Sequence, residues 1–95
     1  MRINILKKTG NEMEFELEGE GHTFCNVLRK ELLNDPNVEY AAYRIDHPLV
    51  GVPVFYVRTK GKDPIEALID ATNRIRKSTE EFMEKFKKAV SEYRK

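Results

Sequence analysis

The chain has 95 residues, of which 40% are hydrophobic and 35% charged, so it has room for one small core under a highly charged surface. Its 17 basic and 16 acidic residues give a net charge of +1, which disfavours a dedicated nucleic-acid or membrane-surface binder. It has one cysteine, and its first residues lack the apolar stretch of a signal peptide. We therefore expect one domain over residues 1–95 in a cytoplasmic protein.

The first segments read as a β-hairpin, because residues 1–8 and 12–18 alternate between hydrophobic and polar side chains. Pairing Lys8 with Glu12 across the turn would place Ile5 opposite Phe15 and Arg2 opposite Glu18. The hairpin would then have one buried face and one solvated face.

A short helix is expected next, capped by Thr23 and ended by residues 34–36, Asn-Asp-Pro. Residues 38–46 and 52–59 are rich in valine and tyrosine and predict a second hairpin, joined by a loop at 47–51. Asp63 and Pro64 then open a helix that no glycine or proline interrupts. This order predicts an α+β fold in two layers, strand-strand-helix-strand-strand-helix, with a four-stranded antiparallel sheet, helices on one face and a long C-terminal helix.

The last helix is too long for the rest of the chain. Its hydrophobic seam repeats every three to four residues and includes Leu68, Ile75, Phe82, Phe86 and Val90. A helix from residue 64 to 94 is about 46 Å long, whereas a globule of this size is only about 30–35 Å across. We therefore expect an uncovered apolar patch on the distal half of the helix, which is typical of an interface.

Candidate catalytic and metal sites are weak. Cys25 follows His22 by three residues near a helix N-terminus, where a thiolate nucleophile is conceivable, but a buried structural cysteine is favoured. His22 and His47 lack the paired spacing of metal ligands. Alternate glutamates on a strand lie about 7 Å apart, which is typical of a solvated face. We predict no catalytic residue, metal site or cofactor in this chain.

One stretch carries a family resemblance. Residues 18–29, EGEGHTFCNVLR, with 34–38, NDPNV, and 47–49, HPL, resemble the small dimerisation subunits of cellular RNA polymerases. This family includes archaeal subunit L and the eleventh subunit of eukaryotic RNA polymerase II. The resemblance continues through residues 59–61, Pro64 and Ala71 and so covers nearly the whole chain. The family usually has Asp, Leu and Gly where this sequence has Gly21, Phe24 and Cys25.

The resemblance implies a non-catalytic assembly subunit of DNA-directed RNA polymerase, active in transcription as part of that nucleotidyltransferase. It implies a heterodimer with the larger alpha-like partner that is designated D in archaea. This pair forms a platform for the two large catalytic subunits, with small subunits N and P nearby. DNA would be contacted only through the complex, and no membrane is involved.

The same resemblance and the helical patterns together supply the expected partner interface. The motif positions carried to it are His22, Thr23, Asn26, Leu28 and Arg29. The helical patterns add Phe24, Val27, Leu32, Leu68, Ile75, Phe82, Phe86 and Val90.

Two alternatives remain open. The same helices could pair with their own copies in a stand-alone homodimeric binding module. A pterin carbinolamine dehydratase has a similar order of elements, but such an enzyme depends on a histidine cluster, and this chain has two histidines.

Overall fold

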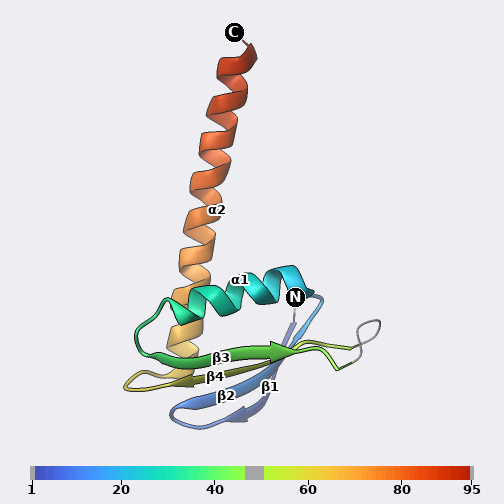
Figure 1. The fold of residues 1–95 in the computed structure, drawn as a ribbon, viewed down its shortest axis with the longest axis vertical. Coiled ribbons are helices and arrows are strands. Elements are labelled where there is room, and N and C mark those ends of the chain that lie inside the picture. Colours follow the sequence, from blue (N-terminus) through green and yellow to red (C-terminus); the bar gives the residue numbers. More distant parts are fainter. Residues whose placement is uncertain (1, 47–50, 95) are drawn as a thin grey trace.

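The computed structural model describes residues 2–46 and 51–94 and contains one antiparallel sheet with strand order β1-β2-β4-β3. Both helices pack on the same face of this sheet, and α2 runs far beyond it (Figure 1). The predicted α+β fold is therefore confirmed. The elements are β1 (Arg2–Lys8), β2 (Glu12–Glu18), α1 (His22–Leu33), β3 (Val38–Arg44), β4 (Val54–Thr59) and α2 (Pro64–Arg94).

The first hairpin has the predicted register at its open end and a different one near its turn. Arg2 lies opposite Glu18 and Ile5 opposite Phe15, as expected. A bulge between Ile5 and Lys7 then places Lys8 opposite Met13, so the predicted pairing of Lys8 with Glu12 is wrong. The extra residue turns the Lys8 side chain toward the start of α2, where its amine lies 3.3 Å from Asp63.

Helix α1 begins earlier than predicted. Gly21 is its N-cap residue, and the Gly21 carbonyl accepts the first helical hydrogen bond from the Cys25 amide at 3.2 Å. The predicted cap at Thr23 is therefore wrong, because that residue already lies within the first turn. The helix ends as expected at Asn34, ahead of Pro36.

The second hairpin is shorter than predicted, and its strand β4 lies in the middle of the sheet, paired with both β2 and β3. The aromatic core follows from this position, since Phe55 stacks on Phe15 at 5.4 Å and on Tyr43 at 5.6 Å between ring centroids. His47 and the other loop residues up to position 50 lie outside the described residues.

Helix α2 contacts the rest of the domain only through its first three turns or so. Its cap is as predicted, because an Asp63 carboxylate oxygen accepts a hydrogen bond from the Ile65 amide at 2.8 Å. Ala67 and Ala71 are fully buried, whereas every described side chain from residue 76 to 92 is exposed. The molecule therefore extends over 55 Å with a radius of gyration of 16.0 Å, against about 12 Å for a compact chain of this length.

Within the described residues, no helix combines the length and the apolar character that crossing a membrane requires.

Candidate protein–protein interface

An open apolar groove of about 260 Å³ lies between the first hairpin and the two helices. Ile3 and Ile5 of β1, Phe24 of α1, and Ile65 and Ile69 of α2 line it. Ile3 and Ile5 are each 54% exposed, so the face predicted to be buried is covered on β2 but open on β1. The reason is that α1 packs on β3 and α2 on β4 and β2, which leaves the edge strand without a covering helix.

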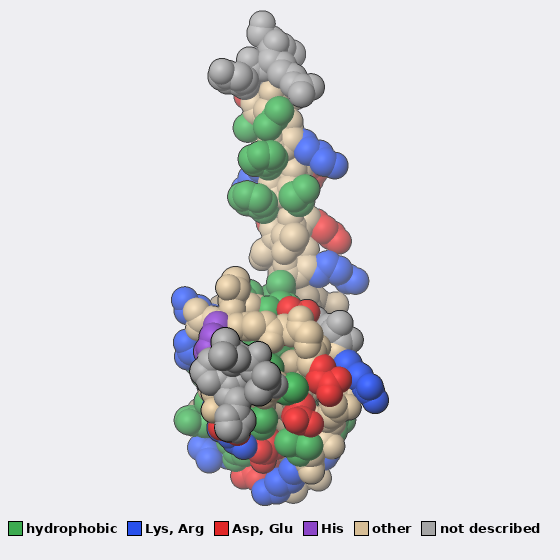
Figure 2. Space-filling view, turned by 90° about the vertical axis from the view of Figure 1, so that its right-hand side faces the viewer, with side chains coloured by type: hydrophobic (Ala, Val, Ile, Leu, Met, Phe, Trp, Pro, Cys, Tyr) green, Lys and Arg blue, Asp and Glu red, His purple; other side chains and the backbone are tan. Residues whose placement is uncertain are grey.

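A second apolar surface, which we call the distal row, consists of Phe82, Met83, Phe86 and Val90 on the projecting part of α2. These side chains are exposed, Phe82 by 64%, and the Phe82 and Phe86 rings stack at 6.1 Å between centroids. Figure 2 shows hydrophobic side chains gathered along one side of the projecting helix, with charged side chains on the other. An aromatic row of this kind is typical of a surface that a partner covers.

The groove and the distal row belong to one continuous seam on α2. Leu68 and Ile75 connect them and are partly buried against the core. Thr72 and Thr79 lie on the same seam, but their hydroxyls donate to carbonyls of their own helix, each at 2.9 Å. No partner is needed to satisfy these hydroxyls, so the seam is effectively apolar along its whole length.

The apolar residues expected on α1 divide between surface and core. Phe24 lines the groove and Val27 is exposed beside it. Leu28 and Leu32 are 3% and 0% exposed and lie in the domain's own core. These two residues were expected to face a partner, but helical spacing cannot distinguish an inward face from an interface. They support the surface from beneath.

The polar motif residues do not line the groove, and one of them, His22, contacts β3. The His22 ring nitrogen Nδ1 lies 3.1 Å from the Tyr43 hydroxyl of that strand. One and two turns further along α1, the Arg29 guanidinium donates to the Asn26 side-chain oxygen at 3.0 Å. Thr23 is exposed in the first turn of the same helix. The expected interface residues therefore divide into apolar residues at the groove and the α2 seam and polar residues of α1 that lie outside the groove.

Cys25 is buried and glutamates of β2 form ion pairs, although both were considered as candidates for catalysis or metal binding. Burial raises the pKa of the Cys25 thiol, which is the opposite of what an activated thiolate nucleophile requires. The β2 glutamates form ion pairs across the outer sheet face, such as Glu12 with Lys7 at 3.4 Å and Glu14 with Arg44 at 3.6 Å. Among the described residues, no group of three or more His, Cys, Asp or Glu side chains could hold a metal ion.

The family model of the RNA polymerase Rpb3/Rpb11 dimerisation domain matches residues 12–85, from β2 to the distal row. The chain belongs to this family.

Relatives within the family are similar to this chain over nearly their full length. A DNA-directed RNA polymerase subunit Rpo11 of Methanosarcina barkeri is 43% identical over 91 residues, 96% of this chain and 99% of that protein. The Rpo11 subunit of Pyrococcus furiosus is 43% identical over 95% of this chain and 98% of its own. The crystal structure of DNA-directed RNA polymerase subunit L from Thermoplasma acidophilum superposes with a TM-score of 0.85 at 29% identity, covering 97% of this chain and 91% of that one.

Sequence reasoning missed Ile3 and Ile5 as candidate interface residues of this Rpb3/Rpb11 family member. Their alternation with polar residues correctly predicted a strand with an apolar face. No signal in the sequence could show that the face stays open, because this depends on the position and tilt of two helices that come later in the chain.

Proposed function

We propose that the chain is a non-catalytic assembly subunit of a DNA-directed RNA polymerase. It pairs with the larger alpha-like polymerase polypeptide, hereafter the alpha-like partner, and the pair is the platform for the two large catalytic subunits. The observation that carries this proposal is the distal row: Phe82, Met83, Phe86 and Val90 are exposed on a helix that leaves its own domain. Membership in a dimerisation family supports the same reading.

The surface suits an obligate interaction. Obligate interfaces commonly bury more than about 2,000 Å² and resemble a domain core cut in two, with aromatic residues enriched. A seam from the groove to the distal row offers such a surface on one side of α2. A partner with a related sheet and helices could place its own long helix along the seam, closing a helical bundle between two sheets.

The rest of the proposal follows from this role. Residues 1–95 act as a single domain, and small subunits N and P and the DNA are reached through the assembled polymerase in the cytoplasm. Nucleotidyl transfer and its magnesium belong to the largest subunits. The polar residues His22, Thr23, Asn26 and Arg29, which lie apart from the seam, form a second part of the contact with the partner.

The direct test is Phe86→Glu in a co-expression experiment with the alpha-like partner. Phe86 is 55% exposed, so the substitution leaves the free fold intact, but in the complex it buries an unpaired carboxylate. We expect heterodimer formation to fall at least a hundredfold, measured by mass photometry or size exclusion with light scattering.

The matched control is Lys88→Glu, which makes a larger change of charge on the opposite side of the same helix and should leave pairing within about twofold. Normal pairing of the Phe86→Glu variant would contradict the proposed interface. Recovery of the wild-type chain only with itself, when the alpha-like partner is present, would instead favour a homodimeric module.

A further inference from the structure

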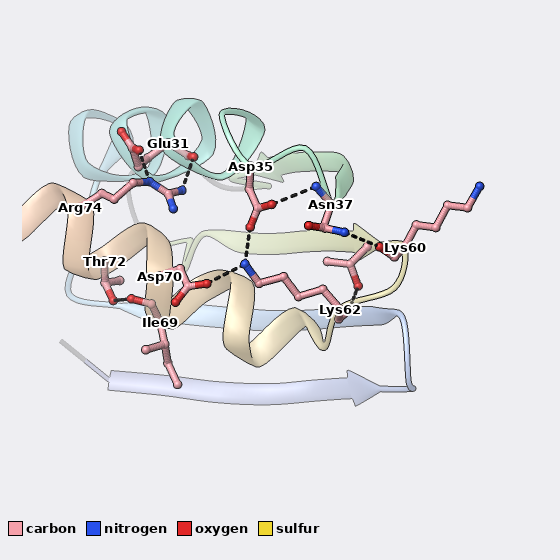
Figure 3. A network of polar contacts seen from close by, with 10 residues as sticks. Glu31, Asp35, Asn37, Lys60, Lys62, Ile69, Asp70, Thr72 and Arg74 are labelled. Carbon is pink, nitrogen blue, oxygen red and sulfur yellow. Dashed lines mark hydrogen bonds and ion pairs between the residues drawn. The ribbon is translucent and has the colours of Figure 1, made fainter.

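One arginine of helix α2 forms a polar contact with α1. The Arg74 guanidinium donates through Nε to a Glu31 carboxylate oxygen at 2.5 Å and through Nη2 to the Glu31 backbone carbonyl at 2.9 Å (Figure 3). Two bonds from one planar group to one residue restrict both the distance and the angle between the elements. Arg74 lies at the end of the packed part of α2, just before the side chains become fully exposed.

A second polar contact between the same elements lies one turn earlier on α2. The Lys62 amine lies 2.6 Å from an Asp70 carboxylate oxygen of α2 and 2.7 Å from the Asp35 carboxylate at the end of α1. Asp35 is 6% exposed and also accepts a hydrogen bond from the Asn37 amide at 2.9 Å. Figure 3 shows these groups in a series from α1 across to the first turns of α2.

Both polar contacts lie on the same side of α2. Asp70 and Arg74 are four residues apart and so lie one above the other on the helix. Ala67 and Ala71 are buried beside them, and the seam with Leu68 and Ile75 follows on the far side of the alanines. The two small alanines allow a close approach to the sheet, and Leu68 and Ile75 pack against the core. The ionic contacts add directional restraints on the other side of the alanines.

The tilt matters because α2 acts as a lever. Val90 lies 16 residues beyond Arg74, or about 24 Å along the helix axis. A change of about 10° in tilt at Arg74 would move Val90 by about 4 Å, far more than a packed interface tolerates.

We propose that Arg74 and Asp70 are positioning residues, which set the direction of α2 so that the distal row and the groove meet the partner together. Partly exposed ion pairs contribute little to stability, whereas holding a binding surface in its bound arrangement raises affinity by reducing the ordering cost. The part of the proposal that concerns partner affinity rests on the proposed function; the part that concerns helix direction does not.

The test measures direction and affinity separately, with Arg74→Ala as the main variant. Spin labels at Glu39→Cys on β3 and Lys88→Cys on α2, in a Cys25→Ala background, report the distance between sheet and distal helix in the free chain. We expect a narrow distance distribution for the parent and a broader one for Arg74→Ala. In the unlabelled full-length chain, affinity for the alpha-like partner should fall about tenfold in the same variant, with the melting temperature nearly unchanged.

Graded variants keep the result interpretable. Arg74→Lys retains the charge but loses the two-point contact, so it should broaden the distance distribution to an intermediate degree. Asp70→Asn should also broaden the distribution while leaving Asp35 paired with Lys62. Lys77→Ala, an exposed residue on the same helix, is the control. The double exchange Glu31→Arg with Arg74→Glu should restore part of the narrow distribution.

Two results would overturn the proposal: an unchanged distance distribution in Arg74→Ala and Asp70→Asn, or a broadened one with full affinity. If the wild-type chain fails to bind the alpha-like partner at all, the proposed function is wrong. The distance measurement still decides whether the polar contacts of Arg74 and Asp70 set the direction of α2.

Discussion

At the residue scale, the buried carboxylate of Asp35 links three segments of the chain through polar contacts. It lies where α1 ends, it accepts from the Asn37 amide, and it pairs with Lys62 of the loop before α2. The Lys62 ammonium, followed by the Asn37 backbone amide, holds the pKa of Asp35 below its ordinary value of 3.8. The same contact raises the pKa of Lys62.

This pair predicts a specific acid sensitivity. A carboxylate with a lowered pKa in the folded state stabilises the fold above its unfolded pKa and loses this contribution as the pH falls through the folded value. We expect the unfolding free energy of the wild type to decline below about pH 4. Asp35→Asn should lower it by about 1–3 kcal/mol at neutral pH and flatten the decline. Denaturant titrations from neutral pH down to about pH 2.5 measure both effects.

The exposed acid Glu39 provides the control for that experiment, because Glu39→Gln should leave the pH profile of the wild type in place. An equally steep acid decline in Asp35→Asn would show that other carboxylates account for it.

At the element scale, α2 is one helix with two different tasks. Its first turns place Ala67 and Ala71 in the core, whereas the described side chains beyond Ile75 bury nothing within the chain. Isolated helices of modest length are marginal in water, so the distal half depends on continuation from the packed half and on its partner.

This division predicts that stability and pairing can be separated by truncation. A chain ending at Lys77 loses the distal row, and every removed side chain whose burial the structure describes is exposed, so its unfolding free energy should stay within about 0.5 kcal/mol of the full chain. Its pairing with the alpha-like partner should be abolished. Chemical denaturation followed by circular dichroism and a pull-down with the tagged partner measure the two quantities.

Removal of residues 92–95 alone is the matched control and should preserve pairing, because Phe82, Phe86 and Val90 remain. Pairing by the chain that ends at Lys77 would place the binding energy in the groove instead of the distal row.

At the scale of the whole molecule, the extended shape of the free chain exposes an apolar seam that a complex can cover. Binding to the folded state alone stabilises it by mass action, by about 2.7 kcal/mol when the partner is present at about a hundred times the dissociation constant. For a domain of this size this corresponds to a rise in melting temperature of about 10–20 °C.

We therefore predict that the melting temperature of this chain rises when the alpha-like partner is added and depends on the concentration of that partner. Calorimetry at several concentrations measures it, with the Phe86→Glu variant as the reference that should show no rise. A melting temperature that does not respond to the partner would contradict pairing in the folded state.

Much of the fold could be predicted because it depends on local patterns. Alternation predicted the first hairpin and the pairing of Arg2 with Glu18, and valine- and tyrosine-rich segments predicted the second hairpin. Asp63 and Pro64 marked the start of α2, and the length of the uninterrupted helix indicated that it extends beyond its domain. The bulge before Lys7 and the cap at Gly21 were missed, because each depends on backbone geometry that several residue types can adopt.

The sequence by itself determined the element order, the antiparallel α+β class, the family and the apolar side of the long helix, since all of these follow from periodicity and motif along the chain. Only the tertiary structure decided that Leu28 and Leu32 face inward, that Ile3 and Ile5 remain open, and that Arg74 meets Glu31. These features depend on how α1 and α2 cross the sheet. A crossing angle results from packing between segments distant in sequence, and no local pattern encodes it.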